Sequence, residues 1–276
     1  MVNVILPMIP QHKIYCEPFF GGGALFWAKG PSYLETINDT NKNVVNFLEV
    51  LQKQYADLKL MIENSLFSET LFWEAYRIYC HPAGSGKVKR AWAFWMCSNF
   101  SFAAKIGGGI KFSNGSNGTH PGRLMHKKKA DFTEQLFDRL KYVHISCRDA
   151  LVVIPQRDSL ESFFYLDPPY IGADMGHYKG YSLQQFEALL QLISNIKGKF
   201  ILSNYPSDIL TQYSIANNWC AFKLDMRLSA GHHTLGHRRK KEVLVINFEP
   251  HNLFTNHSII LPEFNEISAI RVSNSF

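Results

Sequence analysis

The 276-residue chain predicts an α/β fold whose sheet is mostly parallel. Short apolar runs alternate with amphipathic helical stretches after Asp149, and a glycine-rich turn joins a strand to a helix near the amino terminus. Strands that alternate with helices pair in parallel through right-handed crossovers. The strands expected after Asp149 are 163–166, 200–202, 221–224 and 243–248, and the helices are 183–196 and 208–217.

The amino-terminal region predicts a strand, a glycine turn and a helix within Ile14–Phe26. Glycines at such a turn permit positive φ and let a ligand approach the backbone closely. The run has neither the Gly-Lys-Ser/Thr ending of a phosphate loop nor the spacing of a dinucleotide site, so nothing marks the ligand as a polyphosphate. A second strand, 33–37, ends at Asn38-Asp39, where a carboxylate is placed to accept hydrogen bonds from ribose hydroxyls.

The middle of the chain predicts helices. Apolar residues recur at helical spacing over Asn43–Asn64, and further helices are expected at 70–79, 88–103 and 132–140. The interval Ile106–Gly118 is too rich in Gly and Asn for a helix, so we expect a hairpin or a loop there.

The helix expected at 183–196 has a clear start signal, because Ser182 and Gln185 form an S-x-x-Q capping box. Its apolar residues recur on one side, which we expect to face the sheet. The tail 252–276 predicts either an added edge strand or a loosely attached segment.

The tetrapeptide Asp167-Pro168-Pro169-Tyr170 directly follows the apolar run Phe163–Leu166. Proline cannot donate to a sheet ladder, so two prolines end the strand and leave their carbonyl groups pointing into a cleft. Asp167 and the Pro168 carbonyl are then placed to accept the two hydrogens of an exocyclic amine, while Tyr170 offers a face for a planar ring. The tetrapeptide predicts a site that makes a base amino group nucleophilic; a simple turn is the alternative.

Positive charge is concentrated in one part of the chain. The formal net charge is +6, yet between Lys87 and Arg148 there are 12 Lys or Arg residues and 3 Asp or Glu residues. A lobe of that sign attracts phosphate backbones and releases counterions on binding. The alternative is a solvated surface that is rich in lysine.

Several classes of protein are disfavoured by composition. The longest apolar stretch, around Ala91–Ala104, is interrupted by polar residues and is too short to span a bilayer, and no secretion signal is evident. Five scattered cysteines without a CxxC pair fit reduced thiols better than disulfides or a zinc site. His232, His233 and His237 imitate a metal motif, but the adjacent glycines argue against one, so we expect no metal.

The glycine turn and Asp-Pro-Pro-Tyr, in this order, resemble the Dam-like family of adenine-N6 DNA methyltransferases. The resemblance continues through Ser146–Ala150, Phe200–Tyr205 and Glu242–Asn247 and covers most of the chain. It implies a Rossmann-like sheet that binds S-adenosyl-L-methionine (SAM), with an inserted helical or hairpin DNA-recognition lobe. It also implies methyl transfer to an adenine flipped out of double-stranded DNA. The domains expected are 1–43 with 142–276 for SAM binding and catalysis, and 44–141 for target recognition.

The resemblance implies three groups of site residues. The catalytic residues are Asp167, Pro168, Pro169 and Tyr170. The cofactor-binding residues are Glu17, Pro18, Phe19, Phe20, Gly21, Gly23, Asp39, Asp149 and Asp167, with Glu17 left open between contacting the cofactor's ammonium group and capping the turn. The DNA-binding residues are Lys105, Lys111, Arg123, Lys127, Lys128, Lys129, Tyr178, Lys179, Arg238 and Arg239.

One element of the family pattern, an aromatic-x-Gly-Gly-Lys segment ahead of the glycine turn, does not occur within Met1–Lys13. We therefore expect weak cofactor affinity, or a partner or a missing segment that completes the cofactor pocket. The alternatives to DNA methylation are methylation of RNA and a catalytically silent or partner-dependent DNA-binding subunit. Aspartate at the first position of the tetrapeptide favours adenine as the substrate base. We expect a cytoplasmic protein of prokaryotic or phage type, associated with the nucleoid through DNA.

Overall fold

The computed structural model describes residues 1–102, 106–112, 120–171, 180–227, 239–249 and 268–270, with only the backbone described for 225–227, 239–241 and 268–270. The chain divides into two compact units. The sheet unit comprises the described residues of Met1–Asn38, Arg148–Ala173 and Gly180–Phe276, and the helical unit comprises those of Asp39–Cys147. The divisions at 38/39 and 147/148 differ by a few residues from the expected lobe boundaries.

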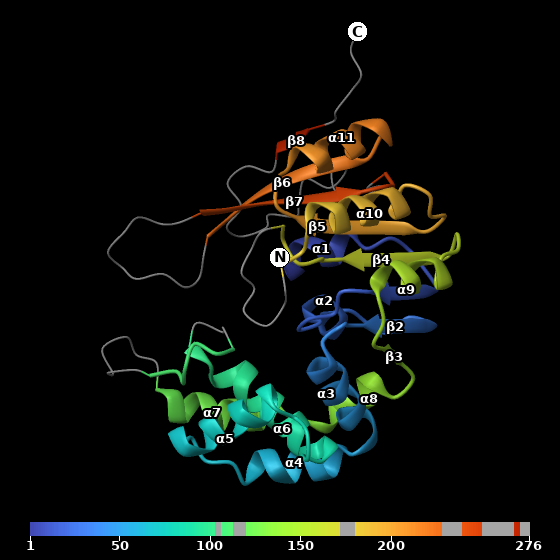
Figure 1. Cartoon of the computed structure of the whole chain (residues 1–276). Coiled ribbons are helices and arrows are strands. Elements are labelled where there is room, and N and C mark those ends of the chain that lie inside the picture. The colour runs from blue at the N-terminus through green and yellow to red at the C-terminus, as the bar shows by residue number, and fades with distance from the viewer. Residues whose placement is uncertain (103–105, 113–119, 172–179, 228–238, 250–267, 271–276) are drawn as a thin grey trace. The chain divides into compact units, whose positions relative to one another are not determined.

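One sheet of eight strands has the order β3-β2-β1-β4-β5-β7-β6-β8 (Figure 1). Its strands are β1 Ile14–Glu17, β2 Leu34–Asn38, β3 His144–Ser146, β4 Ser162–Leu166, β5 Lys199–Asn204, β6 Cys220–Arg227, β7 Arg239–Ile246 and β8 Ser268–Ile270. Strand β1 lies parallel to both β2 and β4, and β4 lies parallel to β5, whereas β7 is antiparallel to β5 and β6. The order reverses on either side of β1, as in doubly wound folds. The predicted Rossmann-like α/β fold is confirmed.

Short helices cover the sheet in the sheet unit. They are α1 Val2–Ile5, followed by the 3-10 turn η1 Leu6–Met8, then α2 Ala24–Ala28, α9 Ala150–Gln156, α10 Leu183–Ile193 and α11 Asp208–Ala216. Apolar side chains of α9 and α10 pack against Phe164, Phe200 and Val245 of the sheet in one buried cluster. Helix α10 begins with the predicted capping box, in which both reciprocal hydrogen bonds of Ser182 and Gln185 are present. This packing fixes the strand ends at which site residues stand.

The helical unit consists of α3 Lys42–Lys53, α4 Tyr55–Glu63, α5 Glu69–Cys80, α6 Lys87–Phe100, α7 Pro121–Ala130 and α8 Glu134–Leu140. The single helix expected over Asn43–Asn64 is wrong, because Gln54 adopts φ −136° and ψ 39° and separates α3 from α4. No Gly or Pro marks this break. The Tyr55 ring instead stacks on Phe132 at 5.6 Å, a tertiary contact that local periodicity does not report.

Two further differences concern the basic part of the helical unit. Helix α6 ends at Phe100, not at Ala103, and Ser101 forms an antiparallel bridge with Ile110. The hairpin or loop expected over Ile106–Gly118 lies partly outside the described residues. Helix α7 was not predicted, because it lacks the helical repeat of apolar residues: Met125 is its one buried side chain. Its first two residues, Pro121 and Gly122, also have low helix propensity. Proline at the first helical position is compatible with a helix start, and the His120 side chain caps it.

The tail contributes β8, which pairs with β6 at the edge of the sheet, the first of the two alternatives expected for it. Among the described residues, none of the helices is long and apolar enough to cross a membrane.

Candidate active site

The carboxyl ends of the parallel strands carry the polar residues that the sequence singled out. Glu17 ends β1, Asn38 ends β2, and Asp167 follows β4. Parallel neighbouring strands end at the same edge, so these side chains share one rim of the sheet. This rim is the candidate active site.

The turn after β1 has the conformation that its glycines predict. Gly21 has φ 50° and Gly23 has φ 61°, values that L side chains rarely adopt. A Cβ atom added to Gly23 would lie 2.1 Å from Cζ of the buried Phe20 ring, whereas one added to Gly22 would meet nothing within 4 Å. Two separate constraints, backbone conformation and close packing, therefore require glycine at Gly23.

Glu17 is the most deeply buried acid of this rim, with 2% of its surface exposed. The Tyr15 hydroxyl donates a hydrogen bond of 2.8 Å to its Oε2 atom. Burial, with a smaller contribution from the charge of Asp167, raises the pKa of Glu17 to about 8, against the opposing effects of Tyr15, Lys29 and the Phe26 backbone. Glu17 is therefore a rim carboxyl that retains its proton near neutral pH in the free protein.

Asp167 differs from Glu17 in being exposed, while Pro168 behind it is buried. Its Oδ2 atom lies 3.5 Å from the Tyr165 hydroxyl. Burial raises the pKa of Tyr165, and the nearby Asp167, Glu17, Tyr170 and Glu242 raise it further. Acids in β1, after β4 and in β7 therefore all influence this buried hydroxyl.

Tyr170, the last residue of the tetrapeptide, is held from two sides. Its ring stacks on Tyr205 with 4.0 Å between centroids and 26° between planes. Its hydroxyl donates a hydrogen bond of 3.2 Å to Oε1 of the buried Glu242. Tyr205 follows β5 and Glu242 belongs to β7, so Tyr170 connects three strands of the sheet.

Asp149 stands at the start of α9, where its Oδ1 atom accepts a hydrogen bond of 2.8 Å from the Leu151 amide. The pKa of the half-buried Tyr181 is raised to about 12, chiefly by burial and to a smaller extent by the charge of the nearby Asp149 carboxylate. Tyr181 also meets the Phe19 ring edge to face at 6.2 Å. An acid and two aromatic rings are therefore gathered beside the glycine turn.

At the end of β2, Asn38 and Asp39 both bind backbone. Asn38 Nδ2 donates to the carbonyls of Pro18 and Arg148, each at 2.9 Å, and so connects the ends of three chain segments. Asp39 Oδ1 accepts a hydrogen bond of 2.7 Å from the Asn41 amide. Asp39 lies at the first position of the helical unit.

The residues expected to bind DNA have different surroundings. Arg123 and Lys127 of α7 are exposed and Lys128 is half-buried. Lys111 Nζ donates to the Asn99 carbonyl at 2.7 Å, and Lys129 Nζ donates to the Glu63 carbonyl at 2.8 Å and to the Ser65 carbonyl. The ammonium groups of Lys111 and Lys129 therefore have structural partners.

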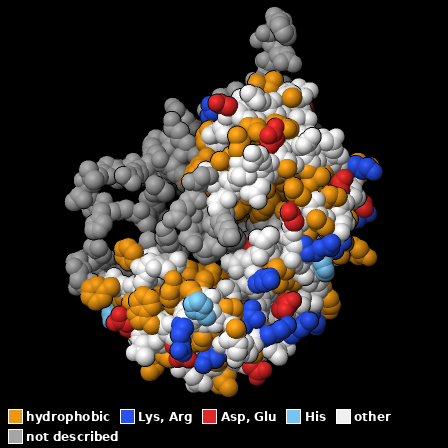
Figure 2. Space-filling model, viewed as in Figure 1, with side chains coloured by type: hydrophobic (Ala, Val, Ile, Leu, Met, Phe, Trp, Pro, Cys, Tyr) orange, Lys and Arg blue, Asp and Glu red, His pale blue; other side chains and the backbone are white. Residues whose placement is uncertain are grey.

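Other expected DNA-binding residues fall elsewhere. Lys105, Tyr178, Lys179 and Arg238 lie outside the described residues, as do the three histidines 232, 233 and 237. Arg239 lies ahead of the strand expected at 243–248, but in the structure it opens strand β7 opposite Arg227. The face of the helical unit seen in Figure 2 intersperses basic side chains with acidic and apolar ones. The described residues include no cluster of three or more His, Cys, Asp or Glu side chains suited to a metal ion.

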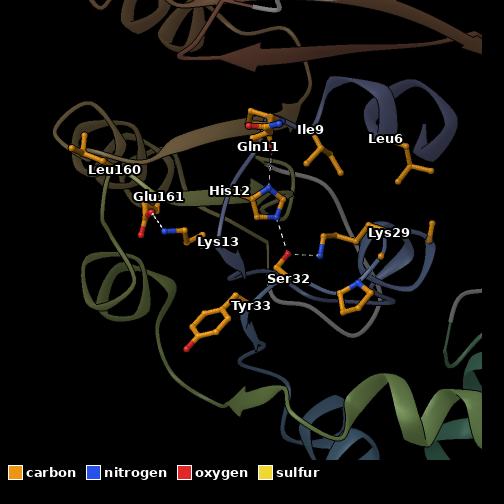
Figure 3. A pocket seen from close by; sticks show the side chains of 14 residues that line it. Leu6, Ile9, Gln11, His12, Lys13, Lys29, Ser32, Tyr33, Leu160 and Glu161 are labelled. Carbon is orange, nitrogen blue, oxygen red and sulfur yellow. Dashed lines mark hydrogen bonds and ion pairs between the residues drawn. The ribbon is translucent and has the colours of Figure 1, made fainter.

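A separate cavity of about 860 Å³ lies at the opposite, amino-terminal rim of the sheet, ahead of β1, β2 and β4 (Figure 3). Ser32 Oγ there contacts His12 Nε2 at 2.8 Å and accepts from Lys29 Nζ at 2.9 Å. Lys29 also forms a buried ion pair of 2.5 Å with Glu35, and its ammonium lies 4.1 Å from the centre of the Tyr15 ring. These contacts support Tyr15 from the side opposite the active-site rim.

Tyr15, Tyr181, Tyr205 and Glu242 are site residues that sequence reasoning missed. Tyr15, Tyr205 and Glu242 lie within the segments Ile14–Phe26, Phe200–Tyr205 and Glu242–Asn247, but the contacts that bring them to the site form only in the folded chain. Local patterns therefore gave no direct signal for them.

No curated protein matches the chain. The family model described as D12 class N6 adenine-specific DNA methyltransferase matches residues 1–239, which include the glycine turn, Asp167–Tyr170 and Tyr205. The chain belongs to the family of D12 class N6 adenine-specific DNA methyltransferases and is a methyltransferase that acts on adenine in DNA.

Proposed function

We propose that this enzyme transfers the methyl group of SAM to N6 of an adenine that has been flipped out of duplex DNA. One observation carries the proposal: an exposed carboxylate, Asp167, stands directly after β4, backed by the buried Pro168 and beside the buried carboxyl of Glu17. An acceptor fixed in this way is suited to grip an amino group at the strand ends where α/β folds bind ligands.

The rim fits SAM in its chemistry. SAM carries a positive sulfonium and a positive ammonium group, and the rim carries Glu17 and Asp167 at neighbouring strand ends. The negative charge of Asp167 attracts these cations, and a cation bound beside Glu17 favours the ionised form of that carboxyl. The positive-φ backbone at Gly21 and Gly23 allows the methionine end to approach the chain closely. When bound, SAM supplies an electrophilic methyl group.

The proposed cofactor contacts follow the order of the strands. Phe19, Phe20 and the glycine turn, with Pro18, hold the methionine end, and Glu17 faces the ammonium group. Asp39 accepts hydrogen bonds from the ribose hydroxyls. Asp149 accepts from the adenine amino group, with Phe19 and Tyr181 beside the adenine ring. A carboxylate offers about four acceptor positions, so the contact of Asp39 with the Asn41 amide and the helix-capping contact of Asp149 are compatible with these roles.

The target amine requires reorientation before it reacts. The lone pair of adenine N6 is delocalised into the ring, so N6 is a poor nucleophile until it becomes pyramidal. Asp167 and the Pro168 carbonyl accept hydrogen bonds from its two N–H groups and direct the lone pair out of the conjugated ring system, and N6 releases one proton once it is methylated. Because these acceptors are fixed before the reaction, they stabilise the transition state at no further cost in reorganisation.

Tyr170, with Pro169 before it, forms the wall against which the flipped adenine stacks. Arg123 and Lys127, which are exposed on α7, are the best-placed described residues for contacts with DNA phosphates. The lysines and arginines predicted outside the described residues are proposed for the same role, and the enzyme is proposed to act in the cytoplasm, where its DNA lies.

The direct test is incubation of the purified enzyme with labelled SAM and, separately, duplex DNA, single-stranded DNA and RNA. Digestion of the products and mass spectrometry identify the methylated nucleoside. The proposal predicts N6-methyladenine, formed fastest in duplex DNA. Methylation confined to RNA, or binding of DNA without any methyl transfer, would instead support one of the two alternative functions.

A further inference from the structure

Two segments that resemble the family have no role in the proposed reaction: Phe200–Tyr205, which contains β5, and Glu242–Asn247, which belongs to β7. The structure brings one residue of each segment, Tyr205 and Glu242, to Tyr170. The register between β5 and β7 places these two residues together. Strands β5 and β7 are antiparallel with Asn204 opposite Val243, so one further step places Tyr205 opposite Glu242.

Both contacts with Tyr170 are specific in geometry. Tyr205 lies against one face of the Tyr170 ring at 4.0 Å and nearly parallel to it. Glu242, which is 3% exposed, accepts the Tyr170 hydroxyl hydrogen bond at 3.2 Å. One contact fixes the plane of the ring and the other fixes its rotation within that plane.

We propose that Tyr205 and Glu242 are positioning residues for methyl transfer, which hold the Tyr170 ring as a rigid wall for the target adenine. The inference rests on the proposed function, in which Tyr170 stacks on the base. An isolated aromatic ring after two prolines would rotate about its side-chain bonds, and a base stacked on it would share that motion. A misplacement of about 1 Å in the reacting atoms can lower a rate by about 100-fold.

The key variants separate the hydroxyl contact from the ring contact. Glu242→Leu removes the acceptor while it keeps similar bulk, Tyr170→Phe removes the donor, and the double variant completes a thermodynamic cycle. Each single change should lower kcat about tenfold, the scale of one hydrogen bond to a carboxylate, with KM for SAM unchanged. If Glu242 acts through Tyr170, Glu242→Leu should cause no further loss in the Tyr170→Phe enzyme.

Conservative variants guard against a folding defect. Glu242→Gln retains an acceptor oxygen and should recover most of the rate lost in Glu242→Leu. Tyr205→Phe retains the stacking ring and should exceed Tyr205→Ala in kcat by about tenfold, the scale of one aromatic pair.

The position of the base is measured in the same enzymes with 2-aminopurine at the target site, whose fluorescence rises on flipping and is quenched by stacking. Glu242→Leu and Tyr205→Ala should leave the flipped base brighter than the wild-type enzyme does. Equal losses of kcat from Glu242→Leu in the wild-type and Tyr170→Phe enzymes would overturn the inference, and so would unchanged fluorescence. Both outcomes presuppose an active wild-type enzyme. An inactive wild-type enzyme would count against the proposed function itself.

Discussion

The Tyr15 hydroxyl donates a 2.8 Å hydrogen bond to Glu17, and the two residues are neighbours on the same side of β1. Lys29 covers the Tyr15 ring from the other rim of the sheet. This contact supports the buried Glu17 carboxyl from within the fold, and the surroundings of Glu17 lead to a prediction about pH.

Glu17 should make the free protein less stable as the pH rises. Its pKa is about 8 in the fold, against an ordinary value of 4.5, because it is buried and faces Asp167, with Tyr15 and Lys29 opposing. Between those pH values the folded state binds more protons than the unfolded state, so the free energy of unfolding falls with rising pH. Glu17→Gln should gain stability relative to the wild type from pH 5 to pH 8, a window set by that pKa shift. Urea unfolding across this range tests it, and parallel curves for the two proteins would contradict it.

The glycine turn allows a matched pair of substitutions. Gly23→Ala should lower the free energy of unfolding by about 1–3 kcal/mol, because it introduces strain at positive φ together with a clash against Phe20. Gly22→Ala, which enters open space, should change it by less than about 0.5 kcal/mol. Thermal and urea unfolding compare the two variants, and similar losses in both would refute the local explanation.

The buried ion pair of Lys29 and Glu35, with side chains 6% and 4% exposed, should be costly to break on one side. Lys29→Met leaves a carboxylate buried beside an apolar group and should lower the free energy of unfolding by about 3–5 kcal/mol. The double variant Lys29→Met/Glu35→Leu should recover most of that loss, because no uncompensated charge remains. A double variant as unstable as the single one would show that packing, not charge, dominates here.

Helix α7 should contribute to DNA binding through its exposed cations. Arg123→Ala/Lys127→Ala should reduce the slope of log affinity against log salt concentration by up to about two units if both side chains contact phosphates. Lys129→Ala is the control, since its ammonium already binds the carbonyls at the end of α4. Lys129→Ala should reduce the free energy of unfolding and leave the salt slope unchanged. A reduced slope in Lys129→Ala, with an unchanged slope in Arg123→Ala/Lys127→Ala, would contradict this assignment.

The sequence predicted the α/β class because the alternation of strands and helices is local and strong. It placed Asp167, Glu17 and the glycine turn at strand ends for the same reason. The break at Gln54 and the start of α7 were not predictable, since a stacked ring and a histidine cap replace the usual Gly or periodic apolar signals.

The supporting residues of the site required the fold. Tyr205 and Glu242 meet Tyr170 only because β5 and β7 pair antiparallel in one register, and no periodicity within either strand encodes that register. Tyr15 looks like an ordinary core residue in the sequence, and its hydrogen bond to Glu17 becomes apparent only in the folded strand.

The central claim is that Asp167 holds the amino group of the target adenine during methyl transfer. The most direct measurement is the single-turnover rate of methylation of duplex DNA by the wild type, Asp167→Ala and the control Asp208→Asn, which changes an exposed acid of α11 outside the site. Asp167→Ala should be slower by about 100-fold or more, the scale of losing a preorganised hydrogen-bonding group, while its fold is unchanged by circular dichroism. A near-normal rate for Asp167→Ala would contradict the account.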